Sequence, residues 1–164
     1  MSSRHKARDA LLRALYLAES RGFSVADAFE EMELIDLEMK VEVDEEEAER
    51  FPLQPFCLDL DTEEKNFALG IASRIEQAKE DFNETITSVL ENWDFSRVSR
   101  IDRFIMWIAL AEMKYLLDIP VTVSINEAVE LAKDFSSEKS PVFINGVLDA
   151  AARKMGVLGE GDKP

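Results

Sequence analysis

Apolar residues recur every three or four positions over most of this sequence, which is the spacing of amphipathic helices. In residues 3–21 the repeat runs up to Gly22, a residue type that commonly ends a helix. Ser24 can cap a second helix, and a third begins near Asp61, because Asp61 and Glu64 have capping-box spacing. The inward-facing positions predicted for these three helices are Ala7, Ala10, Leu11, Ala14, Leu15 and Ala18, then Val25, Phe29 and Met32, then Phe67, Ile71, Ile75 and Ala78.

The third helix is expected to end near Lys79, and a separate fourth helix follows it. Trp93 and Phe95 lie near the end of this fourth helix and are predicted to be core anchors. Residues 97–117 then form a further helix, which Pro120 prevents from continuing. The apolar faces of these segments comprise Phe82, Ile86, Val89 and Leu90, then Ile101, Ile105, Ile108 and Leu116.

The pattern predicts two helices near the C-terminus. Ser124 can cap the first, with Glu127 three residues later closing a capping box. Ser140 followed by Pro141 opens the second, since proline suits the first turn of a helix. Gly146 lowers helix propensity there, a cost that close packing against another helix would offset. The apolar faces comprise Ile125, Ala128, Val129 and Ala132, then Phe143, Ile144, Val147, Leu148 and Ala151.

The helical pattern weakens between residues 34 and 57, where acids mix with isolated apolar residues, Pro52 and Pro55. We expect a solvated, partly irregular connection there. The run at residues 121–123 is too short to support a sheet. The pattern therefore predicts an all-α protein of about six or seven helices. A chain of 164 residues can bury one compact domain, or two small helical subdomains that share one interface.

The formal net charge is −15, which argues against general binding to polyanions such as nucleic acid. The charge is unevenly distributed: acids concentrate between Glu30 and Glu64, whereas Arg4, His5, Lys6 and Arg8 make a locally basic end. A basic end on an acidic body indicates a restricted binding site rather than a general one.

Residues suited to catalysis are scarce. His5 is the only histidine, so a catalytic triad with an imidazole base would have to use this residue of the basic end. Cys57 is the only cysteine, so a metal site built from several thiolates is excluded. The acidic run at residues 44–47 lacks the spaced oxygen ligands and glycine of a calcium loop. No phosphate-binding glycine motif and no apolar run long enough to span a bilayer is present. We expect a cytoplasmic protein that is not an enzyme and uses no cofactor or metal.

Three stretches carry a family signature. They are Asp118-Ile119-Pro120, residues 125–133 and residues 143–149, and they resemble in order and spacing the C-terminal signature of the transcription antitermination factor NusB family. Upstream, the helix after Trp93 and the one that begins with the basic end are also similar to the family. The resemblance covers nearly the whole chain and is weakest at residues 34–60.

This resemblance implies two antiparallel helical bundles in a single domain over residues 1–157. The N-terminal bundle is expected at about 3–80 and the C-terminal one at about 81–156, with an acidic variable connection at about 34–60 and a polar tail at 158–164. It also implies that the protein pairs with NusE, a small-subunit ribosomal protein, and binds the single-stranded boxA element of nascent RNA. That complex joins the elongating RNA polymerase with other Nus factors and suppresses termination.

Two RNA-facing regions follow from the resemblance. Arg4, Lys6 and Arg8, with His5 among them, can neutralise phosphates, and arginine can also stack on bases. The second region is the start of the last helix, at Lys139 and Ser140.

Other positions depart from the family or suggest a protein contact. Val142 stands where a basic residue is common in similar proteins, and Lys139 occupies a position that can be acidic. Trp107 also replaces a common basic residue, and we expect it to pack at a helix junction. Asp102 matches a region that faces NusE in the family and is predicted to contact this partner; the alternative is a surface acid beside Arg103.

Other interpretations stay open. The same helical fold occurs as an accessory domain of RNA methyltransferases, but the short polar stretch after Gly156 holds no catalytic domain. A protein-only adaptor with weak or no RNA binding is the other alternative. Homodimers occur among similar proteins, so self-association is open as well.

Overall fold

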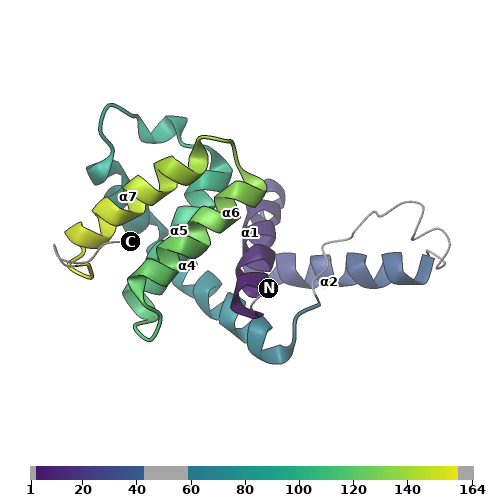
Figure 1. Ribbon diagram of the computed structural model, residues 1–164. Coiled ribbons are helices and arrows are strands. Elements are labelled where there is room, and N and C mark those ends of the chain that lie inside the picture. Colours follow the sequence, from purple (N-terminus) through teal and green to yellow (C-terminus); the bar gives the residue numbers. More distant parts are fainter. Residues whose placement is uncertain (1–2, 43–58, 159–164) are drawn as a thin grey trace. The chain divides into compact units, whose positions relative to one another are not determined.

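The computed structural model describes residues 3–42 and 59–158, with side chains from residues 4–37 and 59–158. Within these ranges the protein is all-helical, and no strand is present (Figure 1). The expectation of about six or seven helices in an all-α fold is confirmed. The elements are α1 (Ser3–Arg21), α2 (Val25–Glu42), α4 (Thr62–Val89), the short 3₁₀ helix η1 (Phe95–Arg97), α5 (Arg100–Tyr115), α6 (Val121–Phe135) and α7 (Ser140–Lys154).

The chain divides into two compact units, one up to Leu69 and one from Gly70 onward. The division falls inside α4, whereas the bundle boundary expected from the resemblance lies near residue 80. Most of the predicted acidic connection and of the predicted polar tail, residues 43–58 and 159–164, lies outside the described residues.

The first unit is built on the contact between α1 and α2. Gly22 has φ of 71°, the left-handed conformation that glycine adopts most readily, and α1 ends immediately before it. The Oγ of Ser24 accepts a hydrogen bond of 3.1 Å from the backbone N–H of Asp27, so the predicted cap of α2 is confirmed. All nine predicted inward-facing residues of these two helices are buried.

The helix α2 is longer than expected. The sequence pattern indicated an irregular connection from residue 34, but α2 continues to Glu42. This prediction was wrong because six of the nine residues from 34 to 42 are leucine, glutamate, methionine or lysine, which favour helix, and none is glycine or proline.

The start of α4 is the predicted capping box. The backbone N–H of Glu64 donates to Asp61 Oδ1 at 2.8 Å, and the N–H of Asp61 donates to Glu64 Oε2 at 2.9 Å. The expected break near Lys79 is absent, since one continuous helix runs from Thr62 to Val89. The reason is that Ala78, Phe82 and Ile86 extend the buried stripe at helical spacing across that point.

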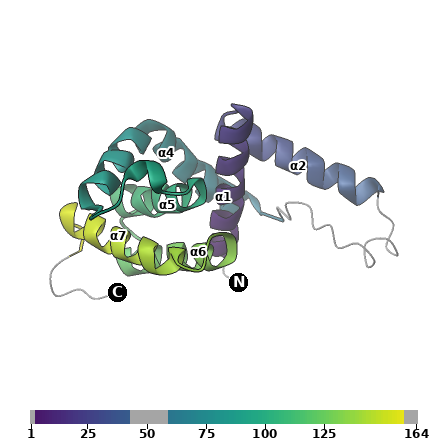
Figure 2. The same ribbon diagram turned by 90° about the horizontal axis from the view of Figure 1, so that it is seen from above.

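The second unit is organised around α5. Figure 2 shows α5 between α4 and the pair formed by α6 and α7, and α5 contacts both members of that pair. Residues 104–113 are all buried, which fits a helix surrounded on every side. Trp107 is buried, and its Nε1–H donates to Asn83 Oδ1 on α4 at 2.8 Å, so the expected packing at a helix junction is confirmed.

The start of α6 differs from the prediction. The N-cap is Pro120, which gives no side-chain cap, and Ser124 lies inside the helix. Ser124 is buried, and its hydroxyl donates at 3.2 Å to the carboxylate of the buried Glu112 on α5. The predicted capping box was wrong because the hydroxyl of Ser124 donates a hydrogen bond to a buried carboxylate and accepts none from a backbone N–H at the helix start.

The helix α7 begins at Ser140 with proline in its first turn, as predicted. Ile144, Val147 and Leu148 are buried as expected. Gly146, however, is exposed, and a Cβ built on it would meet no described atom within 4 Å. Close packing within the described chain therefore does not account for this glycine.

The chain reverses direction after α4 through a short ordered turn. Asn92 has φ of 56°, and the Oδ1 of Asp94 accepts a hydrogen bond of 2.9 Å from the backbone N–H of Ser96 at the start of η1. The prediction that Trp93 is a core anchor was wrong, since 49% of its surface is exposed, and Phe95 is half-buried. Trp93 points outward because it belongs to this turn rather than to the preceding helix.

Candidate functional site

The basic N-terminal cluster sits on one aromatic ring. The guanidinium carbon of Arg4 lies 5.1 Å from the centroid of the Phe67 ring, and that of Arg8 lies 5.4 Å from the same centroid. Arg4 is exposed, whereas only 2% of Arg8 is accessible. Both distances fit cation–π contact. The buried Arg8 is placed to hold α1 against the start of α4, and its contact with phosphates stays a prediction.

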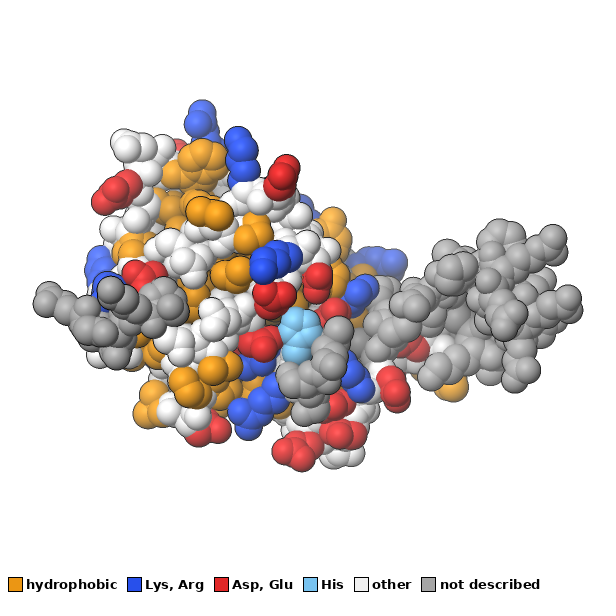
Figure 3. Space-filling view, viewed as in Figure 1, with side chains coloured by type: hydrophobic (Ala, Val, Ile, Leu, Met, Phe, Trp, Pro, Cys, Tyr) orange, Lys and Arg blue, Asp and Glu red, His pale blue; other side chains and the backbone are white. Residues whose placement is uncertain are grey.

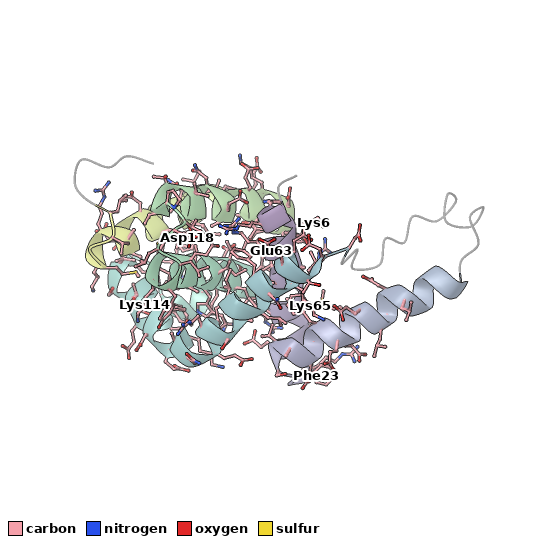
Figure 4. All side chains as sticks on the ribbon, turned by 90° about the horizontal axis from the view of Figure 1, so that it is seen from below. Lys6, Phe23, Glu63, Lys65, Lys114 and Asp118 are labelled. Carbon is pink, nitrogen blue, oxygen red and sulfur yellow. The ribbon has the colours of Figure 1, made fainter. Side chains whose placement is uncertain are left out.

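A carboxylate lies beside Lys6 of this cluster. Lys6 Nζ lies 3.6 Å from Glu64 Oε2, and His5 is half-buried. Figure 4 labels Lys6 on α1 and Glu63 at the start of α4. A pocket of about 360 Å³ opens at this place, lined by Arg4, Asp61, Glu63, Glu64, Asn66 and Phe67. A phosphate at this place would be repelled by the carboxylates and attracted by the cations. Its candidate partners are the exposed Arg4 and the partly exposed Lys6.

In the second unit, Asp102 has a different place from the one expected. Only 7% of this residue is accessible, and its carboxylate accepts hydrogen bonds from Ser140 at 2.9 Å and Ser136 at 2.5 Å. Its backbone N–H donates to Ser99 Oγ, the N-cap of α5, at 3.1 Å. This burial contradicts the alternative of an exposed surface acid, and the contact of Asp102 with NusE stays a prediction. Asp102 joins the start of α5 to the segment between α6 and α7.

Ser140 and Lys139, the predicted RNA-facing pair, are separated by this arrangement. Ser140 is buried, and its hydroxyl also lies 2.9 Å from Ser136 Oγ and 2.8 Å from Ser137 Oγ. Its hydroxyl is therefore engaged inside the chain, and contact of Ser140 with RNA stays a prediction. Lys139 is exposed at the N-cap position of α7, so the structure keeps it available as a surface cation.

The family follows from comparison with known proteins. The model of the NusB family matches residues 5–153. The chain belongs to the NusB family. A transcription antitermination protein NusB from Clostridium botulinum (strain Kyoto / Type A2) is 36% identical over 146 residues, which covers 89% of this chain and 96% of that protein.

Solved structures agree with this membership. The structure of T. maritima NusB superposes with a TM-score of 0.72 at 28% identity and covers 94% of this chain and 93% of that one. A complex of the antitermination factors NusB and NusE with double-stranded RNA gives a TM-score of 0.68 at 21% identity, covering 94% of this chain and 98% of the matched chain. At that identity the second likeness shows the fold alone.

Two functional candidates in this NusB-family chain escaped prediction as site residues. Phe67 was assigned to the core, but it is half-buried and carries the guanidinium groups of Arg4 and Arg8. Trp93 was assigned to the core as well and is exposed. The signal for Trp93 was available, since Asn92 and Asp94 on either side are turn-forming residues.

Other kinds of site find little support in the described ranges. Among residues 3–42 and 59–158, no group of three or more His, Cys, Asp or Glu side chains could hold a metal ion. None of the helices in the same part of the chain combines the length and apolar character that crossing a bilayer requires.

Proposed function

We propose that this NusB-family protein is a transcription antitermination factor. Together with NusE it binds boxA RNA in nascent transcripts and helps the elongating RNA polymerase suppress termination, notably in ribosomal RNA operons. The observation that carries this proposal is the family match over residues 5–153, supported by relatives named transcription antitermination protein NusB. The protein acts where transcripts are made, in the cytoplasm.

The charge distribution suggests how the work is divided between the two proteins. A net charge of −15 repels RNA at long range, and carboxylates line the pocket beside Arg4. The protein alone therefore binds RNA weakly, and a basic NusE supplies positive surface and steering.

The role is that of a binding protein rather than an enzyme. His5, the one histidine of the sequence, is half-buried on α1, and the buried carboxylates of Asp102 and Glu112 accept hydrogen bonds from serines within their own unit. These groups support packing and give no sign of a paired acid and base. The alternative is a protein-only adaptor related to the accessory domain of RNA methyltransferases.

Fluorescence anisotropy of labelled boxA RNA tests this proposal. The RNA is titrated with the protein, with and without NusE, at two salt concentrations. We expect tight, salt-sensitive binding that needs both proteins and disfavours a scrambled RNA. Failure to bind boxA RNA in the presence of NusE of verified activity would favour the adaptor.

A charge-matched pair of variants locates the contact. The double variant R4E/K6E reverses two cations of the N-terminal cluster, and K79E/K154E reverses two exposed lysines elsewhere. Both change the net charge by the same amount, so a larger loss of affinity in R4E/K6E assigns the contact to the cluster. Equal losses would mean that only the overall field matters.

A further inference from the structure

The turn after α4 presents Trp93 to solvent in a defined position. Asn92 before it takes φ of 56°, a conformation that asparagine tolerates better than most residues, and Asp94 after it caps η1. Backbone hydrogen bonds from Arg97 to Asp94 and from Val98 to Phe95, of 2.9 and 3.0 Å, close the turn. Trp93 is 49% exposed, so this ordered turn fixes a large aromatic side chain at the surface, in contact with solvent.

Phe143 of α7 supports this ring. The two ring centroids are 6.0 Å apart with an angle of 48° between the planes, a tilted pair within the range of favourable aromatic contact. Val142 beside it is 81% exposed. We call the ring pair of Trp93 and Phe143, together with the exposed Val142 that precedes Phe143 in the sequence, the Trp93 platform. Lys139, the exposed cation at the start of α7, lies one helical turn before Phe143.

The charge around the Trp93 platform differs from that of the chain as a whole. Arg97 of η1 and Arg100, the first residue of α5, are both exposed. Glu91 and Asp94 are exposed acids of the same turn, whereas Asp102 is buried. Figure 3 shows Lys and Arg side chains beside hydrophobic ones at the top of the view, with Asp and Glu side chains to either side. The two exposed arginines and the two exposed acids of this segment balance, so the surface is close to neutral rather than strongly acidic, and its cations can pair locally with phosphates.

We propose that a single-stranded RNA base stacks on Trp93, with Arg97 and Arg100 neutralising the phosphates beside it. The inference rests on the proposed RNA-binding function and adds a contact that the resemblance did not supply. Every base has a π-face, so this contact is tolerant of sequence and holds the RNA strand instead of reading it. RNA fits better than an apolar protein surface because two exposed arginines follow Trp93 in the same ordered segment, and arginine pairs with phosphate.

The two tryptophans give a direct optical test. Trp107 is buried and hydrogen-bonded to Asn83, so W107F leaves exposed Trp93 as the chain's only tryptophan, and W93F leaves buried Trp107. Unlabelled boxA RNA is added to each variant with NusE, and emission is read against the W93F/W107F double variant as background. We expect RNA to quench the emission of W107F and leave that of W93F unchanged. Binding is followed separately by anisotropy of labelled RNA.

Affinity provides the second measurement. W93A is expected to weaken RNA binding about 5- to 150-fold, the range found for one stacked base, whereas W93F retains most of it. R97A/R100A should flatten the dependence of log affinity on log salt by about 0.7 per lost phosphate contact. The matched control is K79A/K154A, which removes two exposed cations elsewhere and should leave the slope nearly unchanged. Circular dichroism checks that each variant is folded.

The outcomes separate this inference from the proposed function. RNA binding with no quenching of Trp93 and no loss in W93A overturns the inference and leaves the function intact. Absence of RNA binding by the wild-type pair overturns both. A change in Trp93 emission caused by NusE alone, or by raising the protein's own concentration without RNA, assigns the platform to a protein contact and also overturns it.

Discussion

Asp102 Oδ2 on α5 accepts a hydrogen bond of 2.9 Å from Ser140 Oγ, the first residue of α7. Both residues are buried, and Ser136 at the end of α6 donates to the other carboxylate oxygen. One carboxylate thus fixes the start of α7 relative to α5. Because Lys139 and Phe143 flank Ser140 on that helix, the position of the surface cation and of the Trp93 platform depends on this buried link.

Ser140→Ala should lower the free energy of unfolding by roughly 1–3 kcal/mol, because it leaves a buried carboxylate oxygen without its donor. Urea denaturation measures the effect. Ser137→Ala is the control, since Ser137 is exposed and bonds to Ser140 rather than to Asp102, and it should cost much less. Equal losses of unfolding free energy in the two variants would mean that the hydrogen bond from Ser140 to Asp102 contributes no more to stability than the one between Ser137 and Ser140.

Gly146→Ala should stabilise the protein by roughly 0.5–1 kcal/mol, because alanine favours helix and a Cβ there meets nothing in the described chain. Thermal unfolding should show a rise of a few degrees. Gly22→Ala is the opposite control, since its φ of 71° strains any Cβ, and it should destabilise. If Gly146→Ala is stable but weakens binding to RNA or NusE, a partner's close approach explains the glycine.

Arg4→Ala and Arg8→Ala should differ in kind, although both arginines contact Phe67. Arg4 is exposed, so its loss should weaken RNA binding and reduce the salt dependence while leaving unfolding nearly unchanged. Arg8 is 2% accessible, so its loss should destabilise the fold. Parallel measurements of RNA anisotropy and urea unfolding separate the two roles, and a reversed pattern would contradict the assignment.

Hydrogen bonds from the backbone and side chain of Ser96 lower the pKa of Asp94 below its ordinary value of 3.8. A group with a lowered pKa in the folded state contributes stability above its unfolded pKa and loses it as pH falls through the folded pKa. The η1 turn should therefore loosen in acid below about pH 4. Carboxyl chemical shifts of Asp94 followed by NMR check this, with Asp94→Asn as the variant that removes the titration. A titration midpoint of Asp94 at its ordinary value would contradict the hydrogen bonds from Ser96 that cap η1.

The local features of this fold were readable because they depend on neighbours in the sequence. Gly22, Ser24 and the pair Asp61 and Glu64 act over one helical turn, and their predicted roles hold. The signature over residues 118–149 indicated the family for the same reason, since order and spacing are properties of the chain itself. The continuation of α2 to Glu42 was also present in the sequence as helix propensity, but the acids obscured it.

The candidate site was decided by tertiary structure. Their polar side chains favour surface positions for Arg8, Asp102 and Ser140, yet all three are buried. The ring of Phe67 and the junction of α5, α6 and α7 supply partners that are distant in the sequence. Trp93 is the opposite case: tryptophan is usually largely buried, but the turn after α4 leaves this one exposed. Sequence by itself determined the helices and the family, because these follow from local spacing. Which polar groups face inward depends on which helix faces meet, and only the tertiary structure decided that.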